Sequence, residues 1–386
     1  MSAASSFRLP PPGAARVDLL IVAGEHSGDE HAARMVRELT AKRSGLVVAA
    51  LGGRQLAAAG AHLLHDLTAS SVVGVVEVLK NYAFFRALFE ATLHWMAEYR
   101  PRAVCFVDYP GLNLRLAAAM RERGLSVKGG GKIKTLYYIS PQIWAWKAGR
   151  RFTMARDLDA MAVLFPFERK CYLDTTLPVE FVGHPFVMDE YHAPVRYDPA
   201  GPVLLLPGSR KQAVERIFPV LLAGFREYGE RQAVALYPSD DILAVLRRAN
   251  PPVNVSLLPV SARGEEGAPA IAAAAVLTSS GTMSMHCALA GIPGAIAYRA
   301  NPLTYLLGRL VLQVEYLGIA NLLLGEPMYP EFIQNAATPG ALAAELRAAL
   351  HDSSRRERTH AQAKKLRNLL GVPSSGTAAD WLVRQL

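Results

Sequence analysis

The first half of the chain alternates short apolar runs, rich in β-branched residues, with longer segments that have the apolar spacing of helices. The apolar runs predict strands at residues 18–22, 45–51, 103–108, 135–139 and 160–164. The intervening segments predict helices at residues 29–41, 84–99 and 112–123. Continuous apolar strands that alternate with helices are typical of a parallel sheet covered on both faces, because such strands are buried on two sides.

The same alternation restarts after a segment with three prolines and a glycine, residues 192–202. A second set of strands is predicted at residues 203–206, 233–237, 254–258, 274–277 and 294–297. The tail from residue 339 onward is predicted to be helical. The predicted fold class is therefore α/β, with two Rossmann-like, doubly wound parallel-sheet domains that face a cleft. Ligands of such domains bind at the carboxyl ends of the strands.

These patterns set the expected domain boundaries. They are a disordered leader at 1–16, an N-terminal domain at 17–192, a linker at 193–202, a C-terminal domain at 203–345 and C-terminal helices at 346–386. Whether those helices pack back on the N-terminal domain stays open. The apolar run after the leader is too short for a signal peptide, and Asp18 interrupts it.

The composition excludes some classes of protein. Of the 386 residues, 51% are hydrophobic and 19% are charged, which permits sizeable cores and excludes general disorder. The net charge of +9 favours an anionic partner, which is a nucleic acid, a phosphorylated metabolite or a membrane surface. Cys105, Cys171 and Cys287 lie far apart in the sequence, so we expect neither a disulfide framework nor a zinc ribbon. This usage of cysteine is typical of a protein in the reducing cytosol.

Three apolar stretches bear on membrane contact. Residues 267–298 contain no charged side chain and exceed the roughly 20 residues of a membrane-spanning helix. A polar turn at 278–282 and Pro293 interrupt them, so we predict a strand, a turn and a helix, and a chain that is not integral to a membrane. We predict that residues 72–89 and 305–324 are buried in a core. For residues 72–89 the alternative is a patch that faces a membrane or binds acyl chains.

Two motifs of the N-terminal domain follow predicted strands. The run AGEHSGD at 23–29 combines glycines, which allow a tight turn, with a helix N-terminus that suits an anion or a hydroxyl. Asp108 ends the strand at 103–108, where α/β folds place catalytic groups. The alternative for both is an ordinary strand-to-helix turn with an N-cap. The carboxylates and histidines near Glu25 lack the spacing of a standard metal site, so no metal is expected.

Aromatic and basic side chains gather at residues 144–151. Trp144 and Trp146 with three nearby cations form a surface able to meet a sugar ring and a phosphate. Core packing of Trp144 is an equally open alternative. The cations are Lys147, Arg150 and Arg151.

Two anion cradles are predicted in the C-terminal domain. The run LLLPGSRK at 204–211 places a glycine turn and a cation at a helix start, which suits a diphosphate although no P-loop motif is present. The run SSGT at 279–282 precedes another helix. Downstream, Asn321 and the run PEFIQ at 330–334 place polar groups within an apolar stretch.

Taken in order, these motifs resemble the lipid-A-disaccharide synthase family of glycosyltransferases. The matching runs are AGExSGD at 23–29, GG at 52–53, Gly74 with Glu77, Val78 and Leu79, Asp108 through Asn113, SP at 140–141, WAW at 144–146, FPFE at 165–168, GHP at 183–185, LPGSR at 206–210, SGT at 280–282, ANLL at 320–323 and PEFIQ at 330–334. The resemblance extends from about residue 18 to residue 334.

The resemblance implies a GT-B fold and an inverting transfer of 2,3-diacylglucosamine from UDP-2,3-diacylglucosamine to the 6-hydroxyl of 2,3-diacylglucosamine 1-phosphate (lipid X). Such a transfer needs a base for the acceptor hydroxyl, for which Asp108 is the first choice and Glu25 the second. Cations and helix N-termini can hold the UDP diphosphate, so no cofactor or metal is expected. The expected location is the cytoplasm, with peripheral association to the inner membrane, where the positive charge attracts anionic lipid.

The resemblance also implies binding roles. The residues expected to bind UDP and the donor sugar are Ser209, Arg210, Ser280, Gly281, Thr282, His286, Asn321, Glu331 and Gln334. The residues expected to bind the acceptor and its lipid chains are Ser27, Gly28, Gly74, Glu77, Val78, Asn113, Arg150 and Arg151.

Two positions depart from the family pattern. His286 stands where the family has a glutamate suited to the ribose hydroxyls, and Ala213 stands where a glutamate usually follows LPGSR. Neutral histidine can still hydrogen-bond a ribose hydroxyl, so we expect UDP binding with altered contacts. Two alternative functions stay open, which are another GT-B UDP-sugar enzyme and an inactive paralogue. A homodimer is possible as the oligomeric state. Nucleic-acid binding is not expected, because the cations are scattered along the chain.

Overall fold

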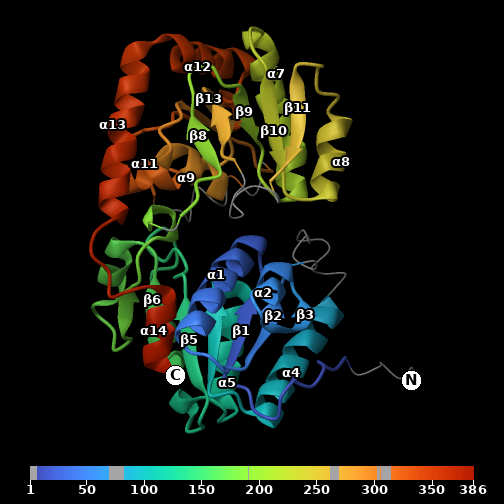
Figure 1. The fold of residues 1–386 in the computed structure, drawn as a ribbon, viewed down its shortest axis with the longest axis vertical. Helices are drawn as coiled ribbons and strands as arrows, with labels where there is room; N and C mark the ends of the chain where they lie inside the picture. Colours follow the sequence, from blue (N-terminus) through green and yellow to red (C-terminus); the bar gives the residue numbers. More distant parts are fainter. Residues whose placement is uncertain (1–6, 69–81, 190, 261–268, 302–304, 306–313) are drawn as a thin grey trace. The chain divides into compact units, whose positions relative to one another are not determined.

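The computed structural model describes residues 7–68, 82–189, 191–260, 269–301, 305 and 314–386. The chain forms two compact units, of which one contains Met1–His184 with Val372–Leu386 and the other contains Pro185–Gly371 (Figure 1). Within the described residues, no helix is both long enough and apolar enough to cross a membrane.

The first unit is built on one parallel sheet. Its strands are β1 (Leu19–Ala23), β2 (Val48–Gly52), β3 (His62–Asp66), β4 (Ala103–Val107), β5 (Lys134–Tyr138), β6 (Ala160–Val163) and β7 (Val179–Phe181), in the spatial order β3-β2-β1-β4-β5-β6-β7. Its helices are α1 (His26–Lys42), α2 (Arg54–Ala58), α4 (Tyr82–Tyr99), α5 (Pro110–Glu122), α6 (Arg150–Asp157) and α14 (Ala378–Gln385), with 3-10 helices η1 (Val127–Gly129) and η2 (Pro166–Tyr172).

Apolar side chains of this sheet alternate between its two faces. In β1, Leu20 and Val22 enter one core while Leu19 and Ile21 enter the other, because neighbouring residues of a strand point to opposite faces. Helices α4, α5 and α6 cover the first face, and α1 and α14 cover the second (Figure 1). The fully buried Trp381 of α14 therefore attaches the end of the chain to the first unit.

Residues 7–10, within the segment expected to be a leader, pack on the first unit. The Phe7 ring meets the rings of His65 and Phe84 edge-on, with 5.5 Å between centroids in each pair. Trp95 Nε1 donates a hydrogen bond to the Pro10 carbonyl at 3.0 Å. An apolar ring and a partner for the indole N–H anchor this segment ahead of β1.

The second unit has a six-stranded parallel sheet and a small two-stranded one. The strands are β8 (Val195–Tyr197), β9 (Val203–Leu206), β10 (Ala233–Tyr237), β11 (Val255–Pro259), β12 (Ile271–Ala273), β13 (Ala275–Thr278), β14 (Gly294–Tyr298) and β15 (Glu331–Ile333), in the orders β11-β10-β9-β13-β14-β15 and β12-β8. The helices are α7 (Lys211–Tyr228), α8 (Asp240–Arg248), α9 (Thr282–Leu289), α11 (Ile319–Leu324), α12 (Pro339–His351) and α13 (Ser353–Leu370), with 3-10 helices η3 (Pro185–Val187) and η4 (Gln334–Ala336).

The seven-stranded sheet of the first unit and the six-stranded sheet of the second are both parallel, which confirms the predicted α/β class. The segment predicted to be a linker, residues 193–202, contains β8, which pairs with β12 of the second unit. From Ile271 onward, the uncharged segment forms β12, β13, α9 and β14, so the predicted strand, turn and helix are confirmed there. In each large sheet the strand order reverses once, between β1 and β4 and between β9 and β13. Such a switch point is where doubly wound folds bind ligands.

Candidate active site

At the switch point of the first sheet, the loops that follow β1 and β4 lie against each other. Ala23 and Val107, the last residues of the two strands, are partners in register. A Cβ added at Gly24 would lie 2.1 Å from the Tyr109 ring, so only glycine fits there. Glu25, which precedes α1 as its N-cap, therefore lies at the same edge of the sheet as Asp108.

The backbone at Asp108 is strained and firmly held. Asp108 has φ +46° and Tyr109 has φ +49°, a left-handed conformation that side-chain-bearing residues rarely adopt. The Asp108 carbonyl accepts hydrogen bonds from the Tyr137 hydroxyl and from Asn113 Nδ2, each at 2.7 Å. The Asp108 N–H donates to the Tyr138 carbonyl at 3.0 Å. Strain that the surroundings maintain in this way is typical of functional sites.

Asn113, predicted to bind the acceptor, is used within the protein. Its side chain is fully buried, and its Nδ2 also lies 3.3 Å from the carbonyls of Val22 and Val107. One amide group thus ties together the ends of β1 and β4 and the Asp108 loop. This arrangement gives Asn113 a positioning role.

Asp108 lines a cavity of about 210 Å³ at this edge. The other lining residues are Pro110, Ile139, Ser140, Pro141, Gln142, Leu164, Phe165 and Glu168. Glu168 is only 2% exposed and accepts hydrogen bonds from Trp144 Nε1 at 3.3 Å and from the Phe165 N–H at 3.1 Å. Burial raises its pKa to about 8, so it is mostly protonated at neutral pH.

In the sequence, Glu168 stands out only as part of the FPFE run, and no role is predicted for it. The available signal was an acidic residue directly after two phenylalanines in a turn, which indicates a partly apolar environment. Trp144, whose core packing was an open alternative, lies half-buried with its indole N–H on Glu168 and its ring edge-on to Phe167 at 5.6 Å.

Asp29, the last residue of the motif at 23–29, is used to cap α2. Its buried carboxylate accepts hydrogen bonds from the N–H groups of Gly53 at 2.7 Å, Gln55 at 3.0 Å and Leu56 at 3.3 Å. A Cβ added at Gly53 would lie 2.5 Å from Asp29 Oδ2, which explains glycine there.

The variant Asp29→Ala should lower the free energy of unfolding of the first unit by about 2–4 kcal/mol, because three N–H groups lose a buried, charged acceptor. Urea unfolding followed by tryptophan fluorescence measures this, since all four tryptophans lie in the first unit. Glu30→Ala, whose side chain on the same helix is 55% exposed, is the matched control and should change stability by less than about 0.5 kcal/mol. Equal losses for both variants would argue against the capping role.

The two arginines that begin α6 differ in their surroundings. Arg151 forms a two-point ion pair with Asp174, with its Nη2 2.7 Å from Oδ2 and its Nε 2.8 Å from Oδ1. Arg150 lies over the Trp146 ring, 4.8 Å from its centroid, and Lys147 lies 4.6 Å from the same ring. Arg151 is thus held by a carboxylate, whereas Arg150 belongs to a cationic and aromatic cluster.

The second sheet has its own switch point, where the loops after β9 and β13 meet. Leu206 and Thr278, the last residues of these strands, are partners in register. Gly208 has φ +103°, which favours glycine, and a Cβ there would lie 3.1 Å from Ser279 Oγ. The Ser279 N–H donates to the Leu206 carbonyl at 2.8 Å.

Two helices begin directly after these loops. Arg210 is the N-cap of α7 and Gly281 is the N-cap of α9. Ser209, Arg210, Gly281 and Thr282 are exposed, and Ser280 is half-buried. The first N–H groups of a helix have no partner within the helix, and the positive end of the helix dipole lies there too, so this edge suits an anion with two charged groups.

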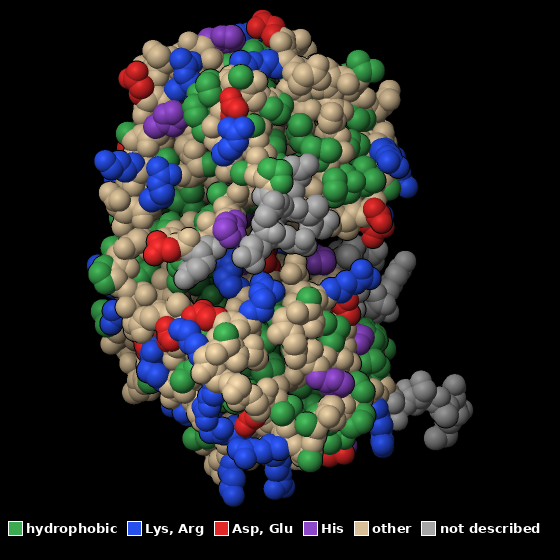
Figure 2. Space-filling view, in the orientation of Figure 1, with side chains coloured by type: hydrophobic (Ala, Val, Ile, Leu, Met, Phe, Trp, Pro, Cys, Tyr) green, Lys and Arg blue, Asp and Glu red, His purple; other side chains and the backbone are tan. Residues whose placement is uncertain are grey.

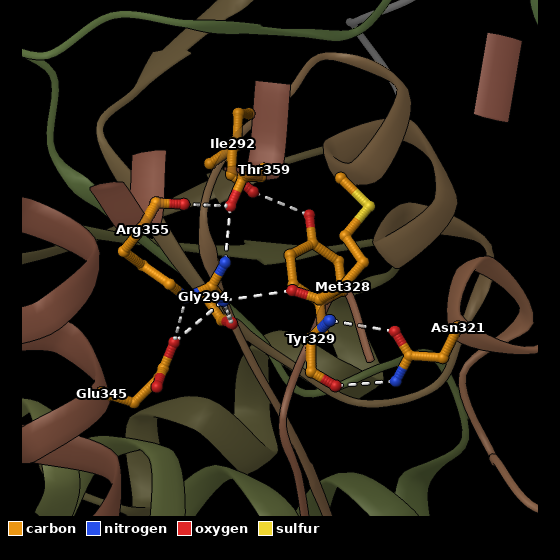
Figure 3. Close-up of polar contacts among 8 residues, drawn as sticks. All are labelled: Ile292, Gly294, Asn321, Met328, Tyr329, Glu345, Arg355 and Thr359. Carbon is orange, nitrogen blue, oxygen red and sulfur yellow. Dashed lines mark hydrogen bonds and ion pairs between the residues drawn. The ribbon is translucent and has the colours of Figure 1, made fainter. Parts of the chain in front are cut away.

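Asn321 and Glu331, predicted to bind the donor, bond to each other and to the backbone. Asn321 pairs with both polar groups of the Tyr329 backbone, at 2.7 and 2.9 Å (Figure 3). Its Nδ2 also donates to Glu331 Oε1 at 2.9 Å. The Glu331 carboxylate also accepts from the N–H groups of Leu317 at 2.8 Å and Gly318 at 2.9 Å. These contacts fix the start of α11 beside β15.

Gln334 behaves in the same way. Its side chain accepts from the Ala300 N–H at 3.0 Å and donates to the Ala300 carbonyl at 3.2 Å. His286, buried in α9, packs on the Phe186 ring with 4.0 Å between centroids, and its Nδ1 is hydrogen-bonded to the Tyr191 hydroxyl. These side chains shape the edge of the second sheet through contacts within their own unit.

A buried ion pair holds the backbone next to Tyr329 and β14 in place. Arg355 of α13 pairs with Glu345 of α12 at 2.9 Å, with side chains 5% and 13% exposed (Figure 3). The same guanidinium donates to the carbonyls of Gly294 and Met328 and to the Thr359 hydroxyl. It therefore joins two C-terminal helices to β14 and to the residue before Tyr329.

The remaining predicted residues divide into two groups. Ser27 is half-buried and Gly28 is buried in the first turn of α1, next to Glu25. Gly74, Glu77 and Val78 lie outside the described residues. Among the residues that are described, no three His, Cys, Asp or Glu side chains come together in a way that would hold a metal ion.

Comparison with solved structures shows the type of fold. The UDP-GlcNAc 2-epimerase from Neisseria meningitidis has a TM-score of 0.58 at 11% identity, covering 96% of this chain and 99% of that one. The glycotransferase of kitacinnamycin has a TM-score of 0.56 at 16% identity, covering 96% and 100%. The calicheamicin glycosyltransferase CalG4 has a TM-score of 0.52 at 14% identity, covering 96% and 98%. The fold is therefore GT-B, as the resemblance implied.

Comparison of sequences shows the family. The family model described as lipid-A-disaccharide synthetase matches residues 19–380. The lipid-A-disaccharide synthase from Nitrosococcus oceani is 35% identical over 378 residues, which cover 95% of each chain. The one from Geobacter sulfurreducens is 35% identical over 372 residues, covering 92% of this chain and 93% of its own. The chain therefore belongs to the lipid-A-disaccharide synthase family of glycosyltransferases.

Proposed function

We propose that the protein transfers 2,3-diacylglucosamine from UDP-2,3-diacylglucosamine to the 6-hydroxyl of lipid X, giving the disaccharide 1-phosphate and UDP. Family membership over residues 19–380 supports this reaction. The observation that carries the proposal is the chemistry of the two switch points. One has the strained Asp108 beside a cavity, and the other has two helix N-termini and Arg210.

The reaction proceeds by a single displacement that inverts the anomeric carbon of the donor. The Asp108 carboxylate takes the proton of the 6-hydroxyl as the hydroxyl oxygen forms a bond to that carbon. The bond from the carbon to the UDP oxygen breaks, and its electron pair leaves with UDP. Glu25, in the adjoining loop, is the second candidate for the base.

The leaving diphosphate binds at the carboxyl edge of the second sheet. Ser209, Arg210 and the turn at 280–282 surround it with N–H groups, hydroxyls and a guanidinium. These groups stabilise the negative charge that develops on UDP as the glycosidic bond breaks. His286 contacts the ribose. The hydrogen bond between Asn321 and Glu331, and the separate one between Gln334 and Ala300, hold the donor-binding loops in place.

The acceptor binds at the carboxyl edge of the first sheet. Ser27 and Gly28 lie beside the acceptor sugar, and Arg150 contacts its phosphate. Asn113 and Arg151 serve this site by holding the loops, as their hydrogen bonds indicate. The roles of Gly74, Glu77 and Val78 with the acyl chains stay predictions.

The enzyme acts at the cytoplasmic leaflet of the inner membrane as a peripheral protein. The net charge of +9 supports attraction to anionic lipid. On the face drawn in Figure 2, Lys and Arg side chains are spread over both units and interspersed with Asp and Glu. This attraction would add to the binding of the lipid substrates.

The proposed reaction is tested by mass spectrometry of a mixture of the purified protein, UDP-2,3-diacylglucosamine and lipid X in detergent micelles. We expect the mass of the disaccharide 1-phosphate and an equal amount of UDP. Release of UDP without a disaccharide, or no turnover of either substrate, would contradict the proposal.

A further inference from the structure

Glu168 is a buried carboxyl that the proposed reaction does not use. It lies at the start of η2 and lines the same cavity as Asp108. Apart from these two, none of the described residues that line the cavity is acidic. Its Oε1 accepts the indole N–H of Trp144, and its Oε2 accepts the backbone N–H of Phe165. In the described part of the chain, no ion pair joins it to a Lys or Arg. A carboxyl buried without a cation is favoured in its neutral form.

We propose that Glu168 stays protonated at neutral pH, so that Asp108 is the one charged carboxylate among the described residues that line the acceptor cavity. The inference rests on the proposed role of Asp108 as the base. Glu168 is a positioning residue in this account, because it acts through the charge of Asp108 and through the electrostatics of the cavity.

Ionisation of Glu168 would impair the site in two ways. Two carboxylates in one small cavity repel each other, which disfavours the arrangement in which the charged Asp108 faces the acceptor hydroxyl. A second negative charge would also repel an acceptor that carries a phosphate. Keeping one of the two carboxyls neutral avoids both effects.

The groups around Glu168 agree with a neutral acid. Burial is the main reason why its pKa rises to about 8, and the negative charge of Asp108 adds to the rise, whereas hydrogen bonds from the Phe165 backbone, the Trp144 side chain and the Leu164 backbone oppose it. Cys171 and Tyr172 of η2 are the other titratable groups that face it, and burial raises the pKa of each, so both are neutral at pH 7. No positive charge among these groups favours the carboxylate.

The first arm of the test needs no enzymatic activity. The pKa of Glu168 is raised from 4.5 to about 8 on folding, so the carboxyl contributes stability that is fully present below pH 4.5 and is lost as the pH rises to 8. Glu168→Gln cannot ionise. In urea unfolding followed by tryptophan fluorescence, the advantage of this variant over wild type should grow with pH up to about 8 and then level off.

The second arm is the pH profile of kcat/KM for the acceptor. Wild-type activity should fall above about pH 8, as Glu168 ionises. Glu168→Gln should lose this alkaline limb and stay within about tenfold of wild type at pH 7, since one hydrogen bond is lost. Trp144→Phe removes a donor that favours the ionised form, so its alkaline limb should move to higher pH. A structural defect alone would not move the limb in that direction.

In Glu168→Gln the amide NH2 group faces one of the two N–H donors, so one hydrogen bond is lost and two donors meet, which can destabilise the variant. The double variant Trp144→Phe/Glu168→Gln removes the indole N–H and should give the same flat profile if the single variant does not fold. An alkaline limb at the wild-type midpoint in a Gln variant, or a stability difference that does not depend on pH, would overturn the inference. If wild type forms no disaccharide, the proposed function fails, while the unfolding arm still decides whether Glu168 holds its proton.

Discussion

Asp108→Asn should lower kcat by about 10²- to 10⁴-fold, the range typical of removing a general base. Asparagine has the same shape, tolerates the left-handed backbone found at this position and leaves the hydrogen bonds to the Asp108 carbonyl intact. It cannot take the proton of the acceptor hydroxyl. UDP binding, measured by calorimetry, should stay at the wild-type value, because the diphosphate cradle belongs to the second unit.

Glu25→Gln is the matched control for this variant. It removes a carboxylate from the adjoining loop of the same sheet edge, and it should reduce kcat far less. If Asp108→Asn turns over at the wild-type rate while Glu25→Gln is inactive, the two carboxylates exchange roles. Equal losses in both variants would mean that neither is the sole base.

Arg210→Ala should lower kcat by about 10²- to 10³-fold, as expected when a group that stabilises a developing negative charge is removed. Arg210 caps α7 next to Gly208, at the edge of the sheet where the N-terminus of α9 also lies. Its charge is most needed when the bond to UDP breaks, so kcat should fall more than the affinity for the donor. Steady-state kinetics with varied UDP-2,3-diacylglucosamine separates the two effects.

Lys211→Ala is the control for charge alone. It removes the same positive charge from the neighbouring exposed position, at the first residue of α7. We expect a change of less than about tenfold, since an exposed charge is well screened by solvent. Equal losses in Arg210→Ala and Lys211→Ala would show that net charge matters and that a specific contact of Arg210 does not.

Most strands that apolar runs predicted are buried, although β11, which was also predicted, lies at a sheet edge and is buried only at Val255. β9 and β10 have the predicted bounds, and β4 and β6 differ by one residue at one end. The strands without a prediction include β3, β7 and β15, each of which lies at the edge of its sheet. Edge strands are buried less, so in β3 only Leu64 is buried and the run HLLHD has no continuous apolar pattern.

The positions of candidate site residues were predictable, but their partners were not. Asp108 and Arg210 follow strands at the two switch points, where the alternation of strands and helices places ligand-binding loops. Asn113 and Asn321 carry polar groups in apolar surroundings, and a sequence alone cannot tell whether such an amide meets a substrate or a backbone carbonyl. In the structure the amide nitrogen of each donates to a backbone carbonyl, and that of Asn321 also donates to Glu331.

The protonation state of Glu168 also could not be predicted from the sequence. Its charge and its place in a motif are visible in the sequence, but its neutral state depends on burial beside Asp108, and these two residues come together only in the folded sheet. Three-dimensional contacts of this kind decide protonation, because desolvation and neighbouring charges set a pKa.

The most direct test of the central claim is the configuration and stoichiometry of the product. Proton NMR of the disaccharide, with UDP quantified in the same sample, measures both. We predict one disaccharide per UDP and an anomeric carbon whose configuration is opposite to that of the donor. Retained configuration, or UDP in excess of disaccharide, would contradict a single displacement in which Asp108 activates the acceptor hydroxyl.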